Sequence, residues 1–236
     1  MNIALIVAGG KGARAGQDVP KQFLTVYDTP IIVYTMENIK ATGLFNELYV
    51  VCAKEWESFV CSYAKQYGID VFSGTIEAGE TRFDSMVQGV EFLKSNHSEK
   101  DVLCITDGNR PLIPARVFKE CIDKIQRTDC CVAAEPCYDS LFTVNMETHQ
   151  LIKHVDRSLI FKEQCPEVAE LDLVYEICEK AKQENNTNKP LAGLMIDYGK
   201  KVSFVEGSSK NFKITTADDF AVFKALIGER RLQNLK

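Results

Sequence analysis

Glycine and cationic residues alternate near the start of the chain, in "VAGGKGARAGQDVPKQF" at 7–23. Gly9, Gly10 and Gly12 would let closely spaced backbone N–H groups face phosphate oxygens. Arg14 adds planar, bidentate donors and Lys21 adds a point charge, which suits opposite sides of a triphosphate. The stretch predicts a loop that binds a nucleoside triphosphate. The alternative interpretation is a solvated loop in which the cations occur by chance.

The same loop matches the dinucleotide fingerprint G-x-G-x-x-G/A only in part. A dehydrogenase would also need an acidic residue about 20 positions later, at the end of the second strand. That strand ends in "VVCAKE", and the segment nearest the required spacing reads "NIKATG". We therefore do not predict a nicotinamide site.

Two later motifs place polar groups after apolar strands. Asp107 and Arg110 lie in "ITDGNRPLI" at 105–113, and Asn211 and Lys213 lie in "EGSSKNFKITTADD" at 206–219. A carboxylate beside a triphosphate suits Mg²⁺, which prefers one or two carboxylates together with phosphates and waters. The alternatives are an aspartate that forms a turn before the next helix and a pair of surface lysines.

The scaffold that must position these motifs is predicted from apolar patterns. Non-alternating apolar runs predict buried parallel strands at 3–8, 48–53, 70–73, 102–106, 131–137 and 201–207. Helical spacing predicts helices at 30–42, 81–95, 115–126, 168–183 and 217–233. Strands that alternate with helices indicate a doubly wound α/β fold with a mostly parallel sheet.

The alternation breaks at about 138–162, where no helical stripe is present. We interpret this segment as a β-arm that projects from the body and pairs with a second subunit. An ordinary edge hairpin of the same sheet fits the pattern equally well. The chain contains no repeat or low-complexity tract, so we predict one domain over 1–236.

The composition limits the classes of partner. A formal net charge of -5 gives no general attraction to nucleic acid or to an anionic membrane. No apolar run approaches the roughly 20 residues that span a bilayer. The opening "MNIALIVAGG" lacks the cationic region of a secretory signal. The nine cysteines form no C-x-x-C pair, and with three histidines no zinc site is predicted, so we expect a reducing, cytoplasmic compartment.

Taken together, the motifs resemble those of the cytidylyltransferases that join CTP to a sugar-alcohol phosphate. This family includes the methylerythritol-phosphate enzyme of isoprenoid synthesis and the ribitol-phosphate enzyme of teichoic acid and capsule synthesis. The resemblance runs from "AGGKGARAGQDVPKQFL" through "AGETRFDSMVQGV" and "TDGNRPLI" to "NFKITTADDF". It implies a Rossmann-like nucleotidyltransferase fold, and "LIVAGGKG" with "KNFKITTADDF" favours the ribitol-phosphate branch.

The resemblance also implies roles for individual residues. Arg14, Lys21 and Lys213 would be catalytic, with Arg14 and Lys21 neutralising the triphosphate. The implied nucleotide contacts are Ala8, Gly9, Gly10, Gly12, Gly79, Glu80, Arg82, Ser85 and Asp107, of which 79–85 would meet the cytosine and ribose. The implied acceptor contacts are Arg110, Asp139, Ser140, Arg157 and Lys213, with Arg157 delivered by the arm of a partner subunit. Asp107 and Asn211 would meet Mg²⁺.

The chain departs from the family pattern mainly on the acceptor side. Phe142 replaces a lysine, "CPE" at 165–167 replaces T-P-Q, and 189–195 replaces the T-D-[DE]-A-S segment. Ser140 replaces threonine and Thr106 replaces histidine, with the hydroxyl and the following carboxylate kept. We expect ribitol 5-phosphate as the acceptor. Methylerythritol 4-phosphate, a glycerol phosphate, a different nucleotide and a non-catalytic homologue remain as alternatives.

Overall fold

The computed structural model describes residues 1–10 and 19–233. The strands of its central sheet are β1 (Asn2–Val7), β4 (Glu47–Cys52), β5 (Phe72–Glu77), β6 (Val102–Asp107), β7 (Cys130–Pro136), β10 (Phe161–Glu170) and β11 (Val202–Glu206). The helices are α1 (Ile31–Ala41), α2 (Lys54–Gln66), α3 (Arg82–Asn96), α4 (Ala115–Lys124), α5 (Leu171–Gln183), α6 (Leu191–Asp197) and α7 (Ala217–Gln233). None of these helices is long and apolar enough to cross a membrane.

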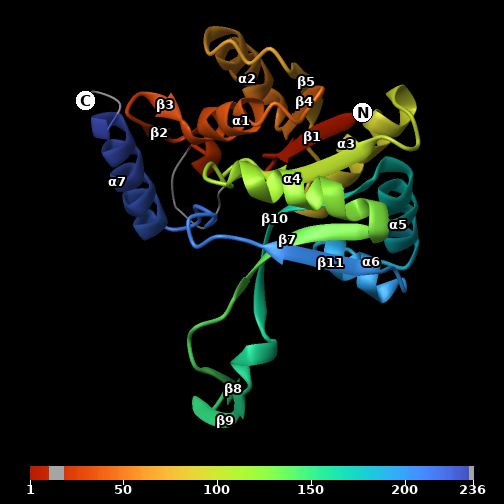
Figure 1. Cartoon of the computed structure of the whole chain (residues 1–236), viewed down its shortest axis with the longest axis vertical. Coiled ribbons are helices and arrows are strands. Elements are labelled where there is room, and N and C mark those ends of the chain that lie inside the picture. Colours follow the sequence, from red (N-terminus) through yellow and green to blue (C-terminus); the bar gives the residue numbers. More distant parts are fainter. Residues whose placement is uncertain (11–18, 234–236) are drawn as a thin grey trace.

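The seven strands follow the order β11-β7-β10-β6-β1-β4-β5 (Figure 1). β1 pairs in parallel with β4 on one side and with β6 on the other, and β10 is the antiparallel strand of this sheet. Because β1 and β6 are adjacent while the chain passes from β1 to β4, the strand order reverses here. The register pairs Val7 with Asp107 at this point. Ligands of open α/β sheets bind at such a point.

Helices pack on both faces of the sheet, so its central strands are buried on both sides. α1, α2 and α4 pack on one face, where Ile6, Val50 and Cys104 meet Met36 and Phe118. α3, α5 and α6 pack on the other face. A third cluster joins α7 to the hairpin of β2 (Thr25–Val26) and β3 (Thr29–Pro30). The sheet is therefore held rigidly enough to fix the positions of its strand ends.

Two predicted boundaries are wrong. The helix expected from 168 begins at Leu171, because Val168, Ala169 and Glu170 complete the antiparallel strand β10. The strand expected at 70–73 is β5, which runs from Phe72 to Glu77 at the edge of the sheet. Helix α2 was not predicted, although its apolar residues follow helical spacing.

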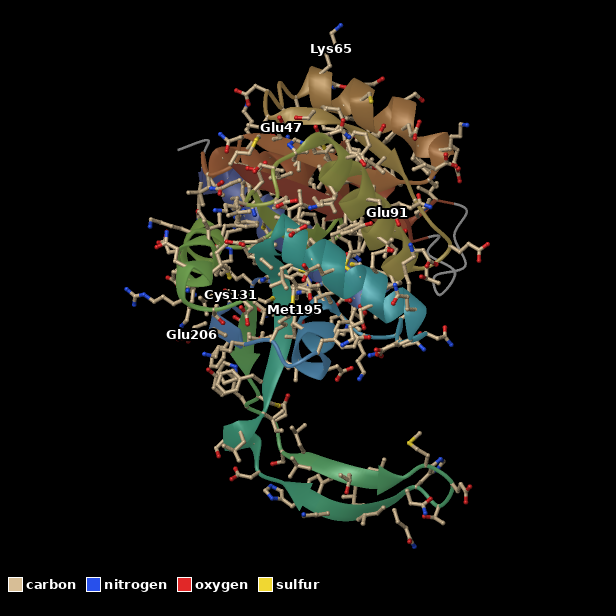
Figure 2. The ribbon with its side chains drawn as sticks, turned by 90° about the vertical axis from the view of Figure 1, so that its right-hand side faces the viewer. Glu47, Lys65, Glu91, Cys131, Met195 and Glu206 are labelled. Carbon is tan, nitrogen blue, oxygen red and sulfur yellow. The ribbon has the colours of Figure 1, made fainter. Side chains whose placement is uncertain are left out.

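A two-stranded ribbon projects from the body, at the bottom of Figures 1 and 2. It consists of β8 (Leu141–Asn145) and β9 (Gln150–Val155), which form a sheet of their own. The short helix η4 (Arg157–Leu159) leads back to β10. The segment is therefore an arm and not an edge hairpin of the central sheet.

All nine cysteines are free thiols. Eight of them are buried, and Cys61 on α2 is exposed. The structure agrees with the prediction that the cysteines in the apolar strands act as small hydrophobic residues.

Candidate functional site

The glycine loop leaves the carboxyl end of β1 and lies against the start of α3. The Ala8 N–H donates to the carbonyl of Val51 at 2.8 Å, which keeps the chain beside β4. A Cβ at Gly9 would lie 2.6 Å from the Cβ of Ala78 and 2.7 Å from the Oγ of Ser85. Only glycine therefore lets the loop approach this closely. Gly12 and Arg14 fall outside the described residues.

The segment expected to meet the nucleoside forms the cap of α3. Thr81 accepts a hydrogen bond from the Asp84 N–H at 3.1 Å, and the Asp84 carboxylate accepts one from the Thr81 N–H at 3.1 Å. This reciprocal capping box fixes the first turn of the helix. An open groove of about 620 Å³ runs along it, and Gly9, Gly79 and Glu80 contribute to its lining. These three predicted residues thus lie on one surface, with Ser85 buried beneath Gly9.

Three cationic side chains surround the carboxylate of Asp107 at the end of β6. Arg82 Nε donates to Oδ1 at 3.0 Å, Lys213 Nζ lies 2.9 Å from Oδ2, and Arg110 Nε lies 3.6 Å from Oδ2. The cations come from α3, from the turn after β6 and from the segment before α7, so the sheet edge brings together parts of the chain that are far apart in sequence. We predicted all four residues as site residues, and the structure brings Arg82, from the segment expected to meet the nucleoside, to Asp107.

The positive charge determines the protonation state of this cluster. Burial alone would raise the pKa of Asp107, but Arg82 and Lys213 hold it well below its usual range. Burial alone would lower the pKa of Arg82, but Asp107 and Glu167 raise it. Asp107 and Arg82 therefore form an ion pair at neutral pH.

Glu167 is a residue of this cluster that we did not predict. It is 2% exposed, and its Oε2 accepts from Nη2 of Arg82 at 3.3 Å. Its Oε1 accepts from the Ala192 N–H at 2.9 Å, in the first turn of α6. Glu167 is part of "CPE", and its partner Ala192 lies within 189–195. Both of these segments depart from the family pattern, and Glu167 links them to Arg82. One feature of the sequence points to Glu167, because it is an acidic residue next to apolar ones, but we predicted no strand at this position.

Asn211 and Cys165 close the buried side of the cluster. Asn211 Nδ2 donates to the carbonyl of Cys165 at 2.7 Å, and Arg110 Nη1 donates to the carbonyl of Asn211 at 2.8 Å. The Cys165 Sγ lies 3.7 Å from Oδ2 of Asp107. Burial, and then the charge of Asp107, raise the pKa of Cys165 to about 12. Cys165 is therefore a neutral thiol and no nucleophile at neutral pH.

The cluster does not fit a metal ion held by Asp107 and Asn211 alone. Both carboxylate oxygens of Asp107 already face cations, and a divalent ion would add to three positive charges. Asn211 Oδ1 is buried with no partner among the described residues, but an amide oxygen brings no charge. In addition, no group of three His, Cys, Asp or Glu side chains suited to a metal is present within 1–10 and 19–233.

Lys21 and Gln22 lie in the short helix η2 (Lys21–Phe23). Lys21 is half-buried and forms no salt bridge with any described residue. Gln22 is buried, and its side-chain amide contacts the backbone of the loop. We predicted a role for Lys21 but none for Gln22, although both lie in the "PKQF" motif.

The predicted acceptor residues of the arm lie apart from this cluster. Asp139, Ser140 and Arg157 are exposed near the base of the arm. Arg157 Nη1 donates to the carbonyl of Tyr138. No hydrogen bond or ion pair joins these three residues to Asp107 or Lys213 within the described part of one chain.

Comparison with known proteins shows to which family the chain is related. A family model described as "IspD: 2-C-methyl-D-erythritol 4-phosphate cytidylyltransferase" matches residues 2–229. The chain is 32% identical over 235 residues to the ribitol-5-phosphate cytidylyltransferase of Lacticaseibacillus paracasei, covering 98% of this chain and 100% of the relative. It is 29% identical over 225 residues to the 2-C-methyl-D-erythritol 4-phosphate cytidylyltransferase of Lachnospira eligens, covering 94% and 97%.

The fold is shared with solved structures. The 4-diphosphocytidyl-2C-methyl-D-erythritol synthase of Anaerococcus prevotii matches with a TM-score of 0.82 and 21% identity, over 96% of this chain and 98% of the other. This likeness confirms the predicted α/β fold. The full-length family match and the resemblance read from the motifs agree. The chain therefore belongs to the IspD family of cytidylyltransferases and is a nucleotidyltransferase.

Proposed function

We propose that this protein transfers a cytidylyl group from CTP to a polyol phosphate, and that the acceptor is ribitol 5-phosphate. The observation that carries the proposal is the convergence of Arg82, Arg110 and Lys213 on Asp107. This group of cations lies at the strand end that pairs with the start of the glycine loop. A reaction between two anions needs such a concentration of positive charge in a protein whose net charge is -5.

The chemistry follows from the two substrates. An oxygen of the acceptor phosphate attacks the α-phosphorus of CTP and forms a new P–O bond. The bond from the α-phosphorus to the bridging oxygen breaks, and pyrophosphate leaves with the electron pair. A phosphate monoester is largely ionised at pH 7 because its second pKa is about 6, so no strong general base is needed. Lys21 and Lys213 then act by holding the anions together and stabilising charge on the phosphoryl oxygens.

The choice of ribitol 5-phosphate rests on the names of the most similar proteins reported above and on the residues that differ from the methylerythritol branch. The relatives at 32% and 31% identity that carry the name ribitol-5-phosphate cytidylyltransferase align over nearly their whole length. Two residues that differ from the methylerythritol branch contact the Asp107 cluster: Cys165 lies beside Asp107, and Glu167 links Arg82 to α6. Methylerythritol 4-phosphate is the second candidate, because the matching family model carries its name.

The test is pyrophosphate release with CTP, UTP, ATP and GTP, each against ribitol 5-phosphate, methylerythritol 4-phosphate, glycerol 3-phosphate and glucose 1-phosphate. We expect turnover with CTP and ribitol 5-phosphate and a kcat/KM at least about tenfold lower for the other acceptors, as differences in a few contacts produce. Faster turnover with methylerythritol 4-phosphate would replace the acceptor. Turnover only with another nucleotide or with the hexose phosphate would refute the proposal, and no turnover with any pair would favour a non-catalytic homologue.

We propose that Mg²⁺ reaches the site on the triphosphate rather than on Asp107. The support is the surplus of cations around Asp107 and the preference of Mg²⁺ for phosphate and water oxygens. Asp107 then serves to hold Arg82, Arg110 and Lys213 together.

We propose that the arm joins two copies of the chain. Large apolar side chains are exposed along it: Tyr138, Phe142, Val144, Met146, Leu151, Ile152, Leu159 and Phe161. Apolar patches of this kind on a folded protein are typical of protein–protein interfaces. Arg157 lies on this arm, so a partner's arm would add a cation to the acceptor site.

A further inference from the structure

Gln22 makes two hydrogen bonds to the backbone of the glycine loop. Its Nε2 donates to the carbonyl of Ala8 at 2.6 Å and to the carbonyl of Gly10 at 3.1 Å. The side chain is 6% exposed, so water cannot replace these bonds freely. Both neighbours are carbonyl oxygens, which only accept, so the amide must present its NH₂ group to them.

These two bonds determine where the loop presents its own donors. In a trans peptide the carbonyl of one residue and the N–H of the next point in opposite directions. With the Ala8 carbonyl directed at Gln22, the Gly9 N–H points away from it. Neither the Gly9 nor the Gly10 N–H donates a hydrogen bond to another residue of the described structure. Free N–H groups in a glycine loop at a strand end form a binding site for phosphate oxygens.

The neighbour of Gln22, Phe23, is fixed by aromatic contacts with α2. The ring of Phe23 stacks on that of Trp56 with centroids 4.1 Å apart, and it meets Phe59 edge-on at 5.6 Å. Successive side chains of a 3₁₀-helix point about 120° apart, so an anchored Phe23 fixes the direction of Gln22. Trp56, Gln22, Gly9 and Gly10 also line one cavity of about 190 Å³.

We propose that Gln22 is a positioning residue for the nucleotide. It holds the backbone of Ala8–Gly10 in the conformation that turns N–H donors toward the phosphates of CTP, and it touches no reacting atom itself. The inference rests on the proposed function, because CTP is the ligand whose phosphates the loop would bind.

The experiment compares Gln22→Met, which keeps the volume and removes the donors, with the wild-type protein. Asn38→Leu is the matched control, because Asn38 Nδ2 also donates to a backbone carbonyl, that of Ile113, at 2.8 Å. Trp56 is the single tryptophan of the chain and lines the cavity, so its fluorescence reports binding of CTP and of inorganic triphosphate. We expect Gln22→Met to raise both dissociation constants about tenfold, as the loss of two hydrogen bonds implies. The KM of the acceptor should change less than twofold.

Gln22→Glu adds a signature that a merely structural role would not produce. A buried carboxylate facing two carbonyl oxygens repels them, whereas the protonated acid donates one hydrogen bond. CTP binding by this variant, relative to wild type at the same pH, should therefore be weakest at pH 8 and should recover toward pH 6. The relative affinity of Gln22→Met should not change with pH.

The possible results separate the role of Gln22 from the proposed function of the protein. Wild-type affinity for triphosphate in Gln22→Met, or an equal loss in Asn38→Leu, would overturn the role of Gln22. An equal rise in the acceptor KM would overturn it as well. A wild-type protein that binds inorganic triphosphate but neither binds nor uses CTP would overturn the proposed function and leave the role of Gln22 standing.

Discussion

At the scale of single residues, the carboxylate of Asp107 balances the cations that we expect to hold both substrates. It is 5% exposed and lies within 3.6 Å of side-chain nitrogens from Arg82, Arg110 and Lys213. Removing one partner from a buried ion pair leaves the remaining charges without compensation, and this costs more than the pair itself contributes. The site therefore depends on Asp107 for its shape as well as for its charge.

Asp107→Asn should lower the free energy of unfolding by about 2 kcal/mol at pH 7, less than for a fully buried pair because Arg82 and Lys213 are partly exposed. The pKa of Asp107 is lower in the folded than in the unfolded chain, so its stabilisation is complete above the unfolded pKa of about 4. It is lost as the pH falls further. Urea unfolding should show the same difference between the two proteins at pH 7 and pH 5 and a smaller difference at pH 3; a difference that stays constant down to pH 3 would contradict this account.

Lys21→Ala should lower kcat by about 10²–10³-fold, the effect of removing one group that stabilises transition-state charge. The fold should be kept, because Lys21 makes no salt bridge with a described residue. Lys65→Ala is the control, since Lys65 is exposed on α2 at the end of the molecule opposite the arm (Figure 2). Initial rates and thermal unfolding measure both effects. Near-normal activity of Lys21→Ala would refute its catalytic role.

The sequence predicted the charged residues of the site better than their neighbours. Asp107 and Arg110 stand out because they follow an apolar strand closely, whereas the role of Lys213 came only from the family resemblance. Glu167 and Gln22 do not stand out, because their roles depend on contacts with residues 85 and 14 positions away in the chain. Such contacts follow from the sheet order and not from local spacing.

At the scale of elements, parallel central strands were predictable and the antiparallel one was not. β1 and β6 are buried on both faces and read as continuous apolar runs. β10 carries Glu163, Gln164 and Glu167, and its register shifts between Gln164 and Glu167, around Pro166. Proline and polar residues argue against a central strand, and a bulge is the place where a strand tolerates proline.

The arm should determine the oligomeric state. Leu151→Glu places a charge on its apolar surface, where Leu151 is 64% exposed, and should shift a dimer toward the monomer at micromolar concentration. Leu232→Glu is the control, because Leu232 is 65% exposed on α7. Sedimentation velocity distinguishes the two states. A wild-type protein that stays monomeric at every concentration would show that the arm has another partner.

At the scale of the whole molecule, the two main apolar clusters cover opposite faces of one seven-stranded sheet. Neither layer can separate without exposing strands that the other layer also covers. We therefore expect a single unfolding transition in urea, with coincident midpoints from far-ultraviolet circular dichroism and from the fluorescence of Trp56. Separate midpoints would indicate that part of the chain unfolds independently.

The distribution of thiols has a practical consequence for such measurements. Cys61 is exposed, while the other eight cysteines are buried. A maleimide dye applied to the native protein should attach at this one position on α2, away from the arm and from the Asp107 cluster. The same reagent also reports unfolding, because the eight buried thiols react only when the helices separate from the sheet. The wild-type chain thus carries its own attachment point for single-molecule distance measurements between two copies.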